Sequence, residues 1–142
     1  MIRIIHFMRL NREKGLTLQV WLWAACFRLL LRFVPIRFLK KHFGAAGEES
    51  PEDESIESYT QARKIAYHVN RISDHTPWES KCLVRALTAQ RLLTKKKISS
   101  TLYLGVKKEN SGMIAHAWIR TGSYYAAGGD GSGYAVVAKF RK

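Results

Sequence analysis

The sequence predicts an α+β fold in which helices come first and consecutive strands then form an antiparallel sheet packed on a helix. Two observations carry this prediction. Apolar residues recur with helical spacing up to about residue 94, and they alternate with a period of two from about residue 100 onwards. With 142 residues, the chain is long enough for one domain with a substantial core.

Residues 1–46 are predicted to form a small N-terminal helical region and a candidate docking surface. An amphipathic helix is expected at about 17–34, with a break at Pro35. A second helical piece stops at Gly44, a residue suited to a helix C-cap. Cys26 lies inside the apolar helix without a polar neighbour, so it is expected to pack in the core.

An acidic segment at residues 47–57 reads as an exposed linker, because it is almost free of apolar side chains. Residues 58–142 are expected to form the main core of the domain. Helices are predicted there at about 58–72 and 79–94. Four strands are predicted after them, in the sequences STLYLGVK, IAHAWIR, YYAA and YAVVAKF, with the glycine-rich loop GGDGSG before the last.

The net charge of +13 is unevenly distributed, with nine Lys or Arg in residues 1–44 and a further run at Lys95–Lys97. Such a surface attracts nucleic acid, anionic lipid or an acidic peptide, and it can equally be a solvated basic face. Charge alone selects no partner. The uncharged stretch Gly15–Phe27 is shorter than the roughly 20 residues of a spanning helix, so membrane contact is not expected.

Two cysteines 56 positions apart, without a cleavable signal sequence, indicate a reducing cytoplasm rather than a disulfide framework. Cys82 is placed in the first turn of its predicted helix, where unpaired N–H groups and the helix dipole stabilise a thiolate. His116 lies on a strand expected to pack on that helix, where it would serve as a base. Each residue taken alone is more often structural, and spacing alone leaves both interpretations open.

The stretch WESKCLVRALTAQRLLTKKKISSTLYLGVKK, followed by AHAWIRTG and YAVVAKF, resembles the lasso-peptide leader peptidases. These are papain- or transglutaminase-like maturation proteases, and the similarity runs from about Trp78 to Phe140. The resemblance implies a papain/transglutaminase-like cysteine protease core. It also implies removal of the leader from a ribosomally made precursor, so that a partner cyclase can close the lactam.

By match to the family motif, Cys82 would be the nucleophile and His116 the general base. Many relatives place an acid about twelve residues after the histidine, whereas this chain has Gly128 there. The nearest acid is Asp130, which orients the imidazole if the loop folds back, or else serves as an ordinary turn residue. One oxyanion donor is expected to be the backbone N–H of Cys82.

Three further side chains are candidates for the wall or support of the site. Trp78 walls the cleft or packs at the helix entry, and Arg85 matches the family's CLVR sequence or is a solvated helix charge. Trp118 shares a strand face with His116. No metal site is expected, because no Cys, His or acid spacing matches a metal cage, and no cofactor is expected.

The N-terminal part has no hairpin-like strands, so it is not expected to contain the winged-helix leader-binding domain of fused relatives. The resemblance then implies a separate leader-recognition protein as partner, with the precursor leader as substrate and no nucleic acid. Three alternatives stay open: a thiol acyltransferase, a basic binding module with a structural Cys82, and a catalytically inactive scaffold of the maturation complex.

Overall fold

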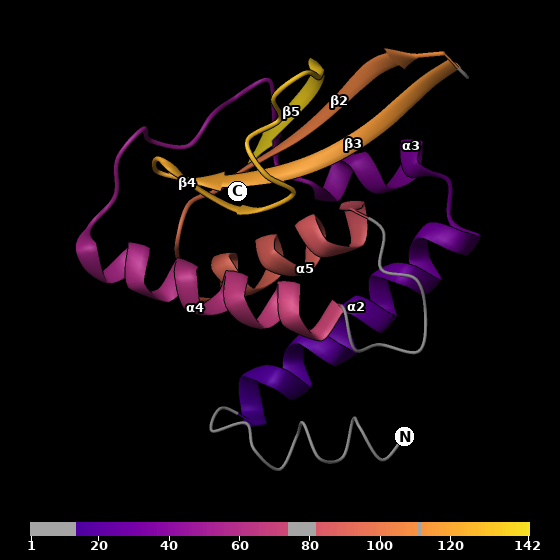
Figure 1. Cartoon of the computed structure of the whole chain (residues 1–142). Helices are drawn as coiled ribbons and strands as arrows, with labels where there is room; N and C mark the ends of the chain where they lie inside the picture. Colours follow the sequence, from indigo (N-terminus) through magenta and orange to yellow (C-terminus); the bar gives the residue numbers. More distant parts are fainter. Residues whose placement is uncertain (1–13, 74–81, 111) are drawn as a thin grey trace.

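The computed structural model describes residues 14–73, 82–110 and 112–142. The α+β prediction is confirmed, with helices on one face of a five-stranded sheet (Figure 1). The helices are α2 (Lys14–Phe33), α3 (Ile36–Leu39), the 3-10 helix η1 (Lys40–His42), α4 (Ile56–Ser73) and α5 (Cys82–Lys95). The strands are β1 (Ala45–Ala46), β2 (Thr101–Glu109), β3 (Gly112–Thr121), β4 (Tyr124–Ala127) and β5 (Ala135–Arg141).

Local sequence explains where the helices begin and end. Helix α2 stops before Pro35, whose ring excludes the preceding residues from continuing the helix. Ser55 caps α4, since its hydroxyl oxygen accepts a hydrogen bond from the Ser58 N–H at 3.1 Å. Helix α5 ends at Lys95. In the turn that follows, Lys97 adopts a left-handed φ of 61°, and the next N–H, of Ile98, bonds back to the Leu93 carbonyl.

All strand pairings are antiparallel, in the order β1-β5-β2-β3-β4. Helix α5 contacts β2, β3 and β4, while α4 and α2 pack on α5 (Figure 1). One face of β3 carries Ala117 and Ile119, which belong to the hydrophobic core shared with α5. Successive strand residues point to opposite faces, so His116, Trp118 and Arg120 lie on the other face.

The N-terminal helical region shares this core instead of standing apart from it. Val20 and Ala24 of α2 are buried, and Val20 belongs to the same cluster as the core residues of α4 and α5. The short strand β1 adds residues of this region to the sheet edge by pairing with β5. Within the described residues, one hydrophobic core therefore extends across the boundary predicted near residue 46.

One expectation about exposure was wrong, and a second holds for most of its segment but not for all of it. Cys26 is exposed, because α2 is apolar on nearly all sides and its periodicity did not show which side faces inwards. The acidic segment 47–57 is not simply an exposed linker, since Ser50 within it is buried. The Ser50 N–H donates to Thr101 Oγ1 at 2.7 Å, and its carbonyl accepts from Arg120 at 3.1 Å, so the segment is tied to the sheet.

Candidate active site

Cys82 is the first residue of α5 and is half-buried against the hydrophobic core. The N–H groups in the first turn of an α-helix have no partner within the helix, and they form the positive end of its dipole. The prediction that Cys82 is a nucleophile rests on these two features of a helix start. The first turn of α5 carries no acidic side chain that would oppose them.

His116 lies on β3, and its Nε2 is 2.7 Å from the carbonyl oxygen of Gly128. A carbonyl oxygen only accepts hydrogen bonds, so Nε2 carries the proton in this arrangement. In neutral imidazole, Nδ1 then holds the free lone pair. The Gly128 carbonyl therefore fixes the tautomer in which Nδ1 can act as a base.

Two aromatic rings hold the imidazole in place. Trp118 lies two residues further along β3, with its ring 5.9 Å from that of His116 and 25° from parallel. Tyr134 approaches from the loop after β4, with a centroid distance of 4.9 Å. Trp118 fits because two glycines leave room for it, since a Cβ on Gly105 would lie 2.6 Å from its ring and one on Gly131 would lie 2.3 Å away.

Asp130 does not contact His116 in the part of the chain that the structure describes. Its Oδ1 accepts hydrogen bonds from the Ser132 N–H at 2.9 Å and the Ser132 hydroxyl at 2.6 Å. These two bonds, the hydroxyl one foremost, lower the pKa of the exposed Asp130 carboxyl. Asp130 is therefore an ordinary turn residue in this structure, and the group bonded to His116 is the Gly128 carbonyl instead of a carboxylate.

The structure brings the Cys82 helix and the His116 strand together, because α5 packs on β3. It does not pair the two side chains directly. Strand alternation places the His116 ring on the face of Trp118, away from the core face that α5 covers. No hydrogen bond joins the Cys82 thiol to the His116 ring among the described residues, so their catalytic pairing stays a prediction.

The structure says less about the last two predicted site residues, Arg85 and Trp78. Arg85 is half-buried on α5, one turn after Cys82. Trp78 lies outside the described residues, so its predicted place beside the thiol remains an expectation. No cluster of three or more His, Cys, Asp or Glu side chains that could hold a metal occurs within the described ranges.

Sequence reasoning missed a polar network beside His116 on the same sheet face. The buried Arg120 donates to the hydroxyl of Tyr103 at 3.0 Å and to the carbonyls of Ser50, Pro51 and Gly122. Tyr103 in turn donates to Glu49 at 2.7 Å. This bond lowers the pKa of Glu49, and burial raises the pKa of Tyr103. The sequence did contain a signal for this network. Strand alternation puts Arg120 on the same face as His116 and Trp118, and a cation on a buried strand face needs hydrogen-bond partners.

Thiol-dependent hydrolases and acyltransferases use a cysteine together with a histidine base. In this structure the helix that begins with Cys82 packs on the strand that carries His116. Residues 22–139 match the family model of the transglutaminase-like superfamily, and the chain belongs to that superfamily. No curated protein and no solved structure matched the chain. Membership points to a cysteine protease or acyltransferase type of activity and leaves the substrate unspecified.

Proposed function

We propose that this protein is a cysteine endopeptidase that removes the leader from a lasso-peptide precursor. The observation that carries the proposal is the hydrogen bond from His116 Nε2 to the Gly128 carbonyl, because it leaves Nδ1 as a base on the strand that packs on the Cys82 helix. Superfamily membership supports the thiol chemistry. The leader-peptidase assignment rests on the WESKCLVRAL and AHAW sequences.

In the proposed reaction, His116 takes the proton of the Cys82 thiol, and the resulting thiolate attacks the scissile carbonyl. The backbone N–H of Cys82 donates to the oxyanion. The imidazolium of His116 protonates the leaving amine, which releases the C-terminal part of the precursor. His116 then takes a proton from water as the water attacks the thioester. This second step releases the leader acid and restores the thiol.

The proposal requires the His116 imidazole, which lies on the sheet face away from α5, to reach the Cys82 thiol when the precursor binds. The loop between β4 and β5 is the element best placed to control this step, since it supplies both the Gly128 carbonyl and the Tyr134 ring that hold His116. Catalytic contacts often tighten only in the substrate complex. A separate leader-recognition protein is proposed to deliver the precursor, and a lasso cyclase is proposed to act on the product.

Acyl transfer is the second candidate function, because the same thioester can be opened by an amine instead of water. The two functions differ only in the acceptor. Adding a primary amine to the reaction separates them by product mass, since hydrolysis gives the leader acid and transfer gives the leader amide.

The test combines the protein with a precursor peptide and its recognition partner and follows cleavage by mass spectrometry. Cleavage is expected with the wild-type chain and with Cys26→Ala, which removes the exposed cysteine on α2. It should be lost in Cys82→Ala and His116→Ala. Cleavage retained in either of these variants would contradict the mechanism. A precursor left uncleaved by the wild-type chain would favour an inactive scaffold or a basic binding module.

A further inference from the structure

The outer side of α2 carries an apolar stripe that nothing in the described structure covers. Leu18, Leu22, Leu29 and Phe33 follow one another at helical spacing and are 51–74% exposed. The opposite side of the same helix is already buried in the core through Val20 and Ala24. The helix is therefore apolar on two sides, and only one of them is used for folding.

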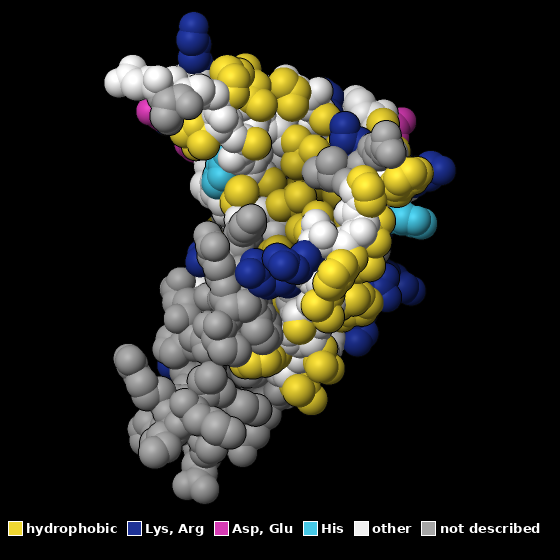
Figure 2. All heavy atoms as spheres, turned by 90° about the vertical axis from the view of Figure 1, so that its right-hand side faces the viewer, with side chains coloured by type: hydrophobic (Ala, Val, Ile, Leu, Met, Phe, Trp, Pro, Cys, Tyr) yellow, Lys and Arg dark blue, Asp and Glu magenta, His cyan; other side chains and the backbone are white. Residues whose placement is uncertain are grey.

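Cations flank this stripe on both sides. Arg32 is exposed near the end of α2 itself. On the other side, the Arg91 guanidinium of α5 lies 4.6 Å above the Trp23 ring, and the Lys95 ammonium bonds to Gln19 at 3.0 Å. Figure 2 looks at the side of the molecule on which α2 ends, and it shows hydrophobic side chains gathered there with Lys and Arg among them. The sequence from residue 15 to residue 47 holds no acidic residue at all.

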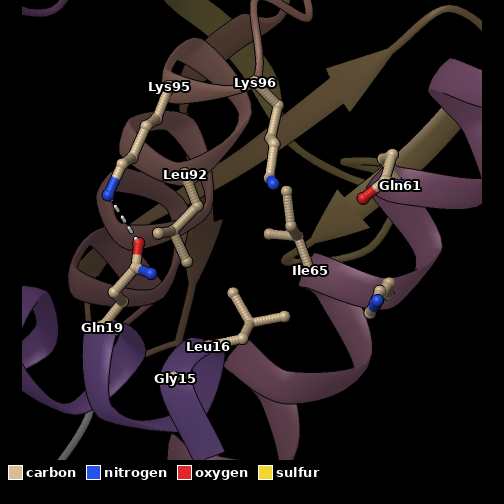
Figure 3. A pocket seen from close by; sticks show the side chains of 9 residues that line it. Gly15, Leu16, Gln19, Gln61, Ile65, Leu92, Lys95 and Lys96 are labelled. Carbon is tan, nitrogen blue, oxygen red and sulfur yellow. Dashed lines mark hydrogen bonds between the residues drawn. The ribbon is translucent and has the colours of Figure 1, made fainter. Parts of the chain in front are cut away.

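A pocket lined by lysines opens beside the N-terminal end of the stripe, between α2, α4 and α5 (Figure 3). Its apolar floor includes Ile65 and Leu92, and Lys64, Lys95 and Lys96 line it. Figure 3 shows the Lys96 ammonium directed into this space. None of the predicted catalytic residues lines the pocket, so it is separate from the candidate active site.

We propose that α2 lies on an anionic membrane surface, with its outer stripe in the lipid and the lysine pocket around an anionic headgroup. Interfacial helices combine an apolar face with a rim of Lys and Arg, which is the pattern of α2 and its neighbours on α5. By length and composition, Gly15–Phe33 also passes the test for a membrane-crossing helix, as buried core helices and signal sequences can. Much of the helix packs against the core, and the outer stripe is the part that stays exposed for lipid.

This proposal revises the expectation that the protein makes no membrane contact. That expectation considered only a helix that crosses the membrane, and Arg28 and Arg32 do interrupt the apolar run that such a helix needs. A helix that lies flat in the interface tolerates such charges, because long basic side chains reach the headgroups while their stems stay apolar. The proposal is independent of the peptidase chemistry.

The test measures sedimentation of the full chain with neutral phosphatidylcholine vesicles and with vesicles that also contain phosphatidylglycerol. Binding is expected only with the anionic vesicles and should weaken as salt rises, because the attraction is screened. Leu22→Gln/Phe33→Gln should lower the partition coefficient by about tenfold or more. The matched control is Met113→Gln/Val137→Gln, whose parent side chains are similarly exposed at 65% and 62% but lie on the sheet, and it should bind normally.

The headgroup pocket is tested by Lys95→Gln/Lys96→Gln. Each cation near an anionic surface contributes about fivefold, so the double variant should bind about 25-fold more weakly than the wild-type chain. The matched control is Lys107→Gln/Lys108→Gln on the β2–β3 hairpin, which makes the same change in net charge away from the pocket. This variant should bind the vesicles normally.

Several results would overturn the proposal. These are no vesicle binding, equal binding to neutral vesicles, or normal binding by the Leu22→Gln/Phe33→Gln variant. A concentration-dependent dimer that this variant abolishes would instead assign the stripe to a second copy of the chain. Normal vesicle binding by the same variant, together with lost precursor cleavage, would assign it to a protein partner.

Discussion

Replacing Gly128 by alanine tests whether its backbone carbonyl positions His116. Gly128 has a φ of +80°, and an added Cβ would lie 2.3 Å from the carbonyl oxygen of Ala117. A left-handed backbone costs an L-residue about 1–2 kcal/mol. The close approach forces the turn to move as well, and the hydrogen bond to His116, worth about 1 kcal/mol, is then lost. We expect Gly128→Ala to lower the free energy of unfolding by at least about 2–3 kcal/mol.

Gly129→Ala is the matched control, because Gly129 has a similar φ of +75° and an added Cβ meets nothing within 4 Å. This control should cost only the left-handed backbone, about 1–2 kcal/mol. At about 3 °C per kcal/mol for a chain of this size, the Tm should fall by about 6–9 °C for Gly128→Ala and about 3–6 °C for Gly129→Ala.

Thermal unfolding followed by circular dichroism measures the stability difference, and precursor cleavage below both Tm values measures the functional one. Gly128→Ala should lower kcat by about tenfold or more, because the imidazole loses the group that fixes its tautomer and orientation. Gly129→Ala should stay near the wild-type kcat. Equal Tm losses and equal kcat values for the two variants would refute the positioning role of the Gly128 carbonyl.

Three further predictions concern the neighbouring polar groups. Asp130→Asn should change cleavage by less than about threefold, because Asp130 bonds to Ser132 and not to His116; a larger loss would restore its orienting role. The Ser132 bonds lower the folded-state pKa of Asp130, so its contribution to stability is present above the unfolded pKa and is lost as pH falls through the folded one. Asp130→Asn should therefore flatten the Tm profile below about pH 4. Arg120→Met should lower the free energy of unfolding, measured in urea, by about 2–4 kcal/mol, because it leaves three carbonyls and a tyrosine hydroxyl without their donor. A loss under about 1 kcal/mol would contradict the stabilising role of that network.

Hydrophobic periodicity predicted most of the fold. The expected helices at 17–34 and 58–72 correspond to Lys14–Phe33 and Ile56–Ser73, and YYAA is β4 as predicted. Strand β1 was not predicted, since two alanines carry no alternation and pair only because β5 lies beside them. Its formation depends on tertiary contacts that no local pattern reports.

The candidate site was less accessible to sequence reasoning. Cys82 at a helix start and His116 on a neighbouring strand follow from periodicity. The group that holds His116 does not, because it is a backbone carbonyl and Gly128 gives no sign of it in the sequence. Asp130 was predicted to orient His116 only because it was the nearest acid in the sequence. The glycines on both sides of it allow a turn in which Asp130 bonds to Ser132 instead.

Alkylation of Cys82 by iodoacetamide tests the central claim most directly, and the exposed Cys26 of the same chain is the internal reference. Peptide mass spectrometry after short exposures near pH 6 gives the rate at each cysteine. If Cys82 is the nucleophile and His116 its base, Cys82 should react faster than Cys26 at that pH, and His116→Ala should remove the difference. Alkylation of Cys82 no faster than that of Cys26, or unchanged by His116→Ala, would contradict the account.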